Sequence, residues 1–173
     1  MDSKEQSTIP VYTIDADALM VMFDPDEALF RGHVGLWGRS ESEIEVGRVV
    51  SHVEVLNEIR KDSRKGQDLY EWAHGHKHIF KDYDWECEAR VIKMMSPKLR
   101  GFVDGGKIKP TNADPWLIAQ AKCLGLTLVS QEKPTLGTGA IIQKIPNVCA
   151  DPIFKVECIN LVGMIRKEGW RFT

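Results

Sequence analysis

The segment from Asn112 to Lys133, NADPWLIAQAKCLGLTLVSQEK, constrains the fold more than any other part of the chain. Apolar residues recur at helical spacing from Leu117 to Leu124, and Gly125 is a typical helix stop. The next four residues, Leu126 to Val129, form a short apolar run of the kind that a strand buried in a parallel sheet requires. A helix that leads directly into such a strand indicates an α/β fold.

The same alternation of strands and helices extends along most of the chain. Further strands are predicted at 11–15, 48–50 and 156–161, and helices at 18–23, from Asp24, after Ser51, at 67–80, at 85–95 before Pro97, and at the C-terminal end as far as Gly169. A glycine- and proline-rich loop is predicted at 133–146. This order favours one domain over residues 1–173, with a mainly parallel sheet covered by helices on both faces and a polar lead-in at 1–10.

Composition and charge exclude several classes of protein. The net charge is -2 and the sequence pI is about 6.2, whereas a generic basic nucleic-acid binder has a pI above about 9. No apolar run is long enough to span a membrane, and the N-terminal ten residues lack the apolar core of a signal peptide. The four cysteines are scattered, with Cys123 and Cys158 expected as small core residues, so a disulfide framework is not expected. We therefore expect a cytoplasmic protein.

Two helix starts carry capping signals. Asp114 is a candidate N-cap, with Pro115 in the first turn, where its missing N–H has no cost. Ser51 is a second candidate, because Glu54 follows three residues later as in a capping box. These assignments are the structural alternative to a functional role for Asp114 and Glu54.

Acidic residues also gather near the predicted strand ends and helix starts. Asp15 ends the first strand, Glu54 and Glu58 share one face of the helix after the second, Asp114 opens a helix, and Glu132 follows the strand at 126–129. In parallel sheets these positions face one crevice. Several carboxylates there would repel one another without a cation, and Mg²⁺ and Mn²⁺ prefer oxygen ligands. The pattern therefore predicts a site for Mg²⁺ or Mn²⁺.

Three blocks of the sequence, YTIDADALM, SHVEVLNEI and NADPWLIAQAKCLGLTLVSQE, together resemble a PIN-like nuclease domain. More narrowly, the chain resembles the small PIN-like proteins with an ADPWLIA block, many of which are taken to be toxins of toxin–antitoxin pairs. The resemblance covers the chain from about Val11 to the terminal helix. It implies a three-layer α/β/α PIN-like fold with a mainly parallel central sheet.

The resemblance also implies a set of catalytic and metal-binding acids. The first acid of the family matches Asp15, the third matches Asp114, and the second best matches Glu58, with Glu54 one turn earlier as the alternative. The fourth best matches Glu132, where the family more often has Asp, and Ser130 lies two residues before it. Asp17 stands where the family often has Asn, Ser or Thr, which makes it a secondary candidate together with Glu54 and Ser130.

The function implied by the resemblance is metal-dependent hydrolysis of RNA phosphodiester bonds, with an antitoxin protein as a partner. Two alternatives remain open: a catalytically degenerate PIN-like binding module, and a phosphatase-type hydrolase that uses Asp15 as a nucleophile. PIN-like proteins commonly pair, and the amphipathic helix from Trp85 to Met95 carries aromatic and methionine side chains, so we expect a homodimer.

The segment AHGHKH is a competing candidate site. His74, His76 and His78 would face one way on a strand and could then bind Zn²⁺. The preceding residues have a helical pattern, however, which would separate the three rings, so exposed histidines at a helix end are the favoured interpretation. Trp116 is expected in the core rather than in the wall of the acidic site.

Overall fold

The computed structural model describes residues 9–23, 42–61, 67–95, 112–135 and 144–170. The elements, in chain order, are β1 (Tyr12–Ile14), α1 (Ala16–Phe23), β2 (Val49–Val50), α3 (Val53–Lys61), α4 (Gln67–Gly75), the 3-10 turn η2 (Lys77–Ile79), α5 (Trp85–Met95), α6 (Asp114–Leu124), β3 (Thr127–Val129), α7 (Ile145–Ala150), β4 (Cys158–Ile159) and α8 (Leu161–Lys167). None of these helices is long and apolar enough to cross a membrane.

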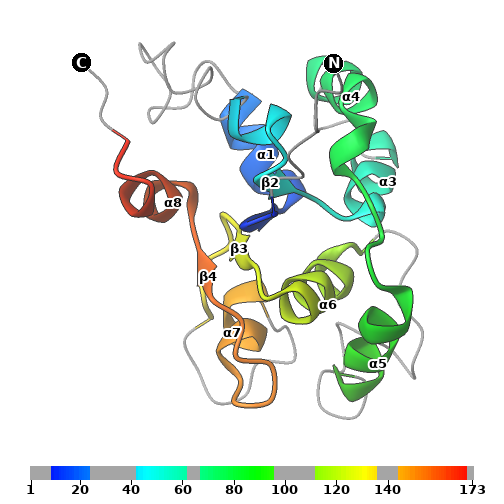
Figure 1. The fold of residues 1–173 in the computed structure, drawn as a ribbon, viewed down its shortest axis with the longest axis vertical. Coiled ribbons are helices and arrows are strands. Elements are labelled where there is room, and N and C mark those ends of the chain that lie inside the picture. Colours follow the sequence, from blue (N-terminus) through cyan, green and yellow to red (C-terminus); the bar gives the residue numbers. More distant parts are fainter. Residues whose placement is uncertain (1–8, 24–41, 62–66, 96–111, 136–143, 171–173) are drawn as a thin grey trace, which may run out of the picture.

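The central sheet is parallel and has the strand order β2-β1-β3-β4. Helices α1, α3 and α4 lie on one side of it, and α5, α6 and α7 lie on the other (Figure 1). The predicted α/β class with a parallel central sheet is therefore confirmed, and the arrangement is compatible with three α/β/α layers. Because every strand runs the same way, the segments that follow β1, β2 and β3 all emerge at one edge of the sheet.

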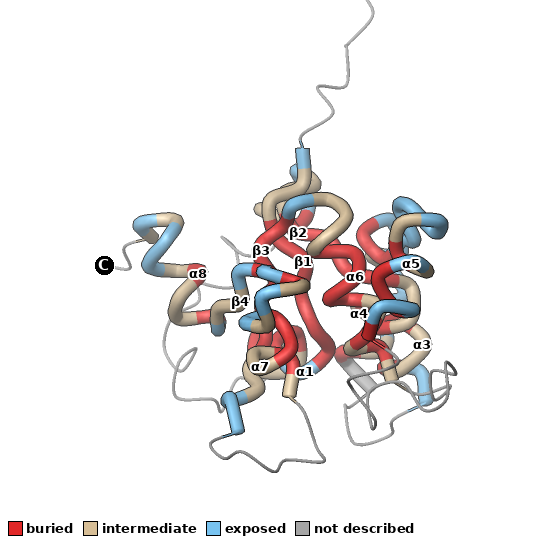
Figure 2. The backbone as a smooth tube through the Cα atoms, turned by 90° about the horizontal axis from the view of Figure 1, so that it is seen from below, coloured by how far each residue is buried: buried red, intermediate tan, exposed pale blue. Residues whose placement is uncertain are grey.

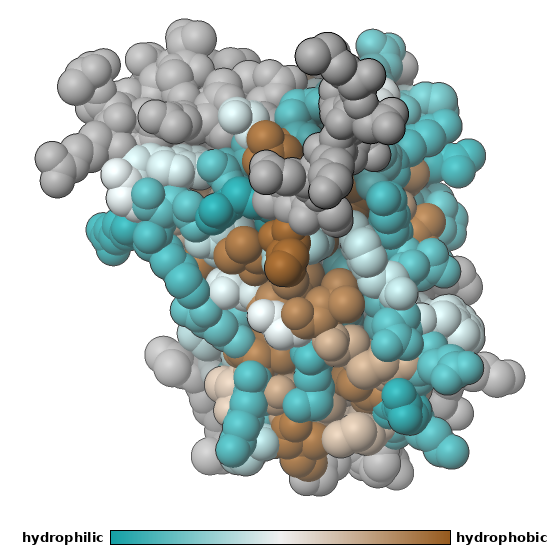
Figure 3. All heavy atoms as spheres, in the orientation of Figure 1, coloured by the Kyte–Doolittle hydropathy of each residue, from teal (hydrophilic) through white to brown (hydrophobic). Residues whose placement is uncertain are grey.

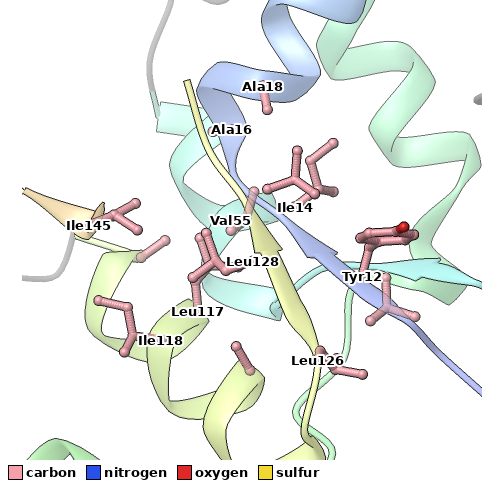
Figure 4. Packing of buried hydrophobic residues seen from close by; sticks show 14 of the residues in the cluster. Tyr12, Ile14, Ala16, Ala18, Val55, Leu117, Ile118, Leu126, Leu128 and Ile145 are labelled. Atoms are coloured by element: carbon pink, nitrogen blue, oxygen red, sulfur yellow. The ribbon is translucent and has the colours of Figure 1, made fainter. Parts of the chain in front are cut away.

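The core forms where the sheet meets its two helical layers. Strands β1, β2 and β3 and much of α6 are the most continuously buried parts of the described chain, whereas β4 is only partly buried (Figure 2). Leu117 of α6, Leu128 of β3 and Val55 of α3 belong to one buried cluster, which Figure 4 shows from close by. This packing fixes the ends of β1 and β3 and the start of α6 relative to one another.

Several local expectations need correction. Neither predicted cap forms: no side chain caps α6, whose N-cap is Ala113, and the Ser51 hydroxyl donates to the Ile14 carbonyl instead. The ring of His52 accepts the Glu54 N–H and so takes the capping role at α3. Helix α7 begins at Ile145, inside the predicted loop, with Pro146 in its first turn, where a proline is tolerated. The helix predicted from Asp24 and the stop at Pro97 lie outside the described residues.

The cysteine prediction is also wrong in one respect. Cys87 of α5 and Cys123 of α6 form a disulfide that joins these two packed helices. Cys149 is buried and free, whereas the free Cys158 is only partly buried rather than a core residue. Disulfides persist mainly in oxidising environments, so the cysteines no longer support the expected cytoplasmic location.

Candidate metal centre

Four acids from four different segments line one pocket at the carboxyl edge of the sheet. Asp15 directly follows β1, Glu58 lies in α3 after β2, Asp114 is the first residue of α6, and Glu132 follows β3. The cavity between them measures about 20 Å³, which is room for roughly one water or ion. The structure thus brings together all four acids that the sequence singled out, although their catalytic and metal-binding roles stay predictions.

The secondary candidates occupy different places. Asp17 lines the pocket from the first turn of α1, and its residue is exposed. Glu54 does not line the pocket, so the position of the two glutamates of α3 favours Glu58 as the second acid. Ser130 is buried, and its hydroxyl hydrogen bonds to Asp15 while accepting the Glu132 N–H at 3.1 Å. Ser130 therefore connects the first acid to the segment that carries the fourth.

Asp15 is the most deeply placed carboxylate of the pocket. Its residue is 4% exposed, and Oδ1 accepts the N–H of Ala18 at 2.5 Å, which caps α1. Burial raises the pKa of Asp15 to about 7, while hydrogen bonds from the Ser130 hydroxyl and the Ala18 N–H act in the opposite direction. Asp15 therefore loses its proton only as the pH approaches and passes about 7, and a positive charge in the pocket would favour its ionised form.

Asp114 is at the first position of α6, and its own N–H donates to Asn112 Oδ1 at 3.1 Å. Its carboxylate is not a cap and lines the pocket instead. Burial raises the pKa of Asp114 to about 7, and the negative charges of the other pocket acids add to the effect, led by Glu132 and then Glu58. The two acids with raised pKa values thus belong to one interacting cluster.

Both oxygens of Glu132 already have partners. Oε1 accepts from Lys144 Nζ at 2.7 Å, and Oε2 accepts the N–H of Ile145 at 2.8 Å. Lys144 lies in the segment that was predicted as loop, and no motif pointed to it. A hydrogen bond and the charge of Glu132 raise the pKa of Lys144, so its ammonium group is charged.

The donor chemistry of the pocket fits a hard divalent cation. All of its ionisable lining residues are carboxylates, and their repulsion is the kind that a cation relieves. With the side chains as they stand, however, no three His, Cys, Asp or Glu residues in the described ranges form a group ready to hold a metal ion. The residues fit the ion by chemistry and charge, and the side chains must adjust to surround it.

A second polar cluster, which the sequence did not indicate, joins the start of α3 to α5 and α6. His52 and Glu88 are both buried, with Nε2 and Oε2 3.2 Å apart. Because His52 Nδ1 accepts the Glu54 N–H, the ring proton is on Nε2 and is donated to Glu88. The His52 ring also stacks on Trp116, which stacks in turn on Trp85. Trp116 does not line the pocket, as expected, but it is only partly buried against the core rather than one of its buried residues.

The competing histidine segment forms no metal group within the described residues. His74 and His78 are exposed, and α4 ends between the first and second histidines. His76 stacks on Trp72 and lies 3.2 Å from a carboxylate oxygen of Glu45. The predicted exposure at a helix end therefore holds for His74 and His78, whereas His76 is partly buried, with its ring centroid 6.0 Å from that of His78.

Comparison with known proteins identifies the family of this chain. Residues 12–172 match the model of a family described as a domain of unknown function, DUF4411. The chain belongs to this family. No match was found among curated proteins or among solved structures. The DUF4411 match covers every strand and every pocket acid, and its description names no activity, so the resemblance to PIN-like nucleases remains a proposal.

Proposed function

We propose that this DUF4411 protein is a PIN-like, divalent-metal-dependent endoribonuclease. The observation that carries the proposal is the convergence of Asp15, Glu58, Asp114 and Glu132, which come from four segments far apart in the sequence, on one pocket. A structural role does not require four acids to meet, because their repulsion opposes folding. A hard cation makes the same arrangement favourable.

Each residue of the pocket has a role in this proposal. Mg²⁺ or Mn²⁺, when bound, would polarise a phosphoryl oxygen and lower the pKa of an attacking water. Asp15 and Asp114 are the central ligands, since burial keeps their carboxylates away from bulk water. Glu58 and Glu132 complete the ligand set or orient the water, and Ser130 fixes the carboxylate of Asp15 through its hydroxyl.

Partners and location belong to the same proposal. RNA is the substrate and an antitoxin protein of a toxin–antitoxin pair is the regulator. The cytoplasm stays the proposed place of action, although the Cys87–Cys123 disulfide does not support it. Exposed Trp85 and Met94 on α5 support a homodimer, and apolar atoms also gather across the middle of the face in Figure 3. Light scattering that shows a monomer at high micromolar concentration would contradict the dimer.

The test is cleavage of a fluorescently labelled single-stranded RNA with and without Mn²⁺. We expect cleavage that depends on Mn²⁺ and that falls by at least about 100-fold in Asp15→Asn. The matched control is Asp84→Asn, because Asp84 also caps a helix through its side chain but is exposed, immediately before α5. Turnover of a phosphomonoester instead of RNA would favour the phosphatase alternative, and metal binding without either activity would favour the degenerate binding module.

A further inference from the structure

Lys144 lies immediately before α7, outside the acidic pocket, and is bonded to one of the acids that line it. Its Nζ donates to Glu132 Oε1 at 2.7 Å, while the N–H of the next residue, Ile145, donates to Oε2 of the same carboxylate at 2.8 Å. Two consecutive residues thus attach to both oxygens of one side chain. This double attachment fixes where the ammonium group lies relative to Glu132.

The position of this ammonium group matters because of the charges around it. None of the described residues that line the pocket is basic, whereas five of them carry carboxylates. The Lys144 ammonium experiences the negative charges of Glu132, Asp114 and Asp17. A phosphodiester that approaches these acids is repelled, and a neighbouring positive charge is needed to hold it even when a cation occupies the pocket.

Lys144 is also accessible to a ligand. Its side chain is 42% exposed, whereas the side chain of Glu132 is 16% exposed, and Lys144 does not line the cavity between the acids. The ammonium group has three N–H donors, and the bond to Glu132 uses one. Lys144 therefore lies at the rim of the pocket with donors to spare, rather than inside it as a substitute for the metal ion.

We propose that Lys144, positioned by Glu132, binds a phosphate oxygen of the RNA substrate beside the acidic pocket. The inference rests on the proposed function, because it assigns a substrate contact to the same site. In this proposal the carboxylates bind the cation, whereas Lys144 binds the phosphate. Loss of the lysine therefore weakens phosphate binding and leaves cation binding in place.

The experiment compares Lys144→Met with a matched control, Lys167→Met. Lys167 forms a similar lysine–glutamate pair with Glu157, but that pair contacts Thr127, at the start of β3 and thus at the opposite edge of the sheet. Isothermal titration calorimetry measures Mn²⁺ binding first, and then binding of 5′-AMP, as a phosphate-monoester probe, both without Mn²⁺ and at saturating Mn²⁺. Circular dichroism establishes that each variant is folded, and Lys144→Arg tests whether the positive charge alone restores binding.

We expect Lys144→Met to raise the Kd for 5′-AMP by about 10- to 100-fold, the effect of losing one charge-assisted hydrogen bond. Its Kd for Mn²⁺ should stay within about threefold of the wild-type value, and Lys167→Met should change neither constant by more than that. Lys144→Arg should bind 5′-AMP more tightly than Lys144→Met, because the guanidinium keeps the charge.

Three results would overturn the inference. The first is unchanged 5′-AMP binding by Lys144→Met. The second is Mn²⁺ binding at least about tenfold tighter in that variant, which would make Lys144 a substitute cation that the metal displaces. The third is a wild-type protein that binds no 5′-AMP with or without Mn²⁺. Failure of the proposed function would appear differently, as a wild-type protein that binds no Mn²⁺ and cleaves no RNA. In that case, the effect of Lys144→Met on metal-free 5′-AMP binding would still decide whether the lysine binds phosphate.

Discussion

Replacing Asp114 with Asn tests two properties of the pocket: how much its negative charge lowers the free energy of unfolding, and whether that charge is needed for metal-dependent cleavage. The pKa of Asp114 is raised from its ordinary value of 3.8 to about 7, chiefly by burial and then by the neighbouring acids. A difference of about three in pKa corresponds to about 4 kcal/mol against the folded state once the carboxyl is ionised. Asp114 is only partly buried, and screening by solvent reduces this figure to about 2 kcal/mol.

The direction of the pH dependence follows from the raised pKa. The folded state holds the Asp114 proton more tightly than the unfolded state, so its favourable contribution is complete below about pH 4 and is lost as the pH rises to about 7. Without metal at pH 8, the free energy of unfolding of Asp114→Asn in urea should therefore be about 2 kcal/mol higher than that of the wild type. At pH 4 the two free energies should be nearly equal. It should also lose RNA cleavage and most of the stabilisation by Mn²⁺.

Asp84→Asn serves as the control for this substitution. It makes the same chemical change at an exposed helix cap, where the side chain accepts the Cys87 N–H, and Asn caps about as well as Asp. The control should show no gain in stability that depends on pH. Equal stability of Asp114→Asn and wild type at pH 8 without metal would refute the electrostatic reasoning, and full metal-dependent cleavage by the variant would refute the role of Asp114.

Three further outcomes are expected. Asp15→Asn should keep the bond from Ala18 N and remain folded by circular dichroism, yet lose Mn²⁺-dependent cleavage; a collapse of folding would instead show that the charge of Asp15 is structural. Mn²⁺ must replace the protons that Asp15 and Asp114 hold, so its affinity by calorimetry should rise up to about pH 7 and level off above; a flat profile would contradict this. Reduction of the Cys87–Cys123 disulfide, which closes a loop with a sequence separation of 36, should lower the free energy of unfolding in urea by about 4 kcal/mol, whereas an unchanged midpoint would show that α5 and α6 pack equally well without it.

The sequence predicted those parts of the fold that local patterns determine. The helix at Asp114–Leu124 and the strand at Thr127–Val129 follow from apolar spacing and from the stop at Gly125, which adopts a left-handed conformation with φ 67°. The convergence of the pocket acids was also predictable, because parallel strands bring their carboxyl ends to one edge. The four acids required no long-range information beyond the direction of the strands.

The remaining features depend on contacts between distant segments. Asp114 had a capping signal, but its carboxylate faces the pocket, because Asn112 takes the N–H that opens α6. His52 replaces Ser51 at the start of α3, since Ser51 is held by the carbonyl of Ile14 in the neighbouring strand. The pairing of Lys144 with Glu132 joins two segments that no spacing or motif in the sequence links.

The most direct test of the central claim is anomalous diffraction from crystals of the wild-type protein soaked in Mn²⁺ at pH 8, above the raised pKa values of Asp15 and Asp114. The predicted result is an anomalous peak in the pocket, bonded to the carboxylates of Asp15 and Asp114 at about 2.2 Å and absent from crystals of Asp114→Asn. A pocket that holds no anomalous peak at millimolar Mn²⁺, with both carboxylates accessible to solvent, would contradict the account.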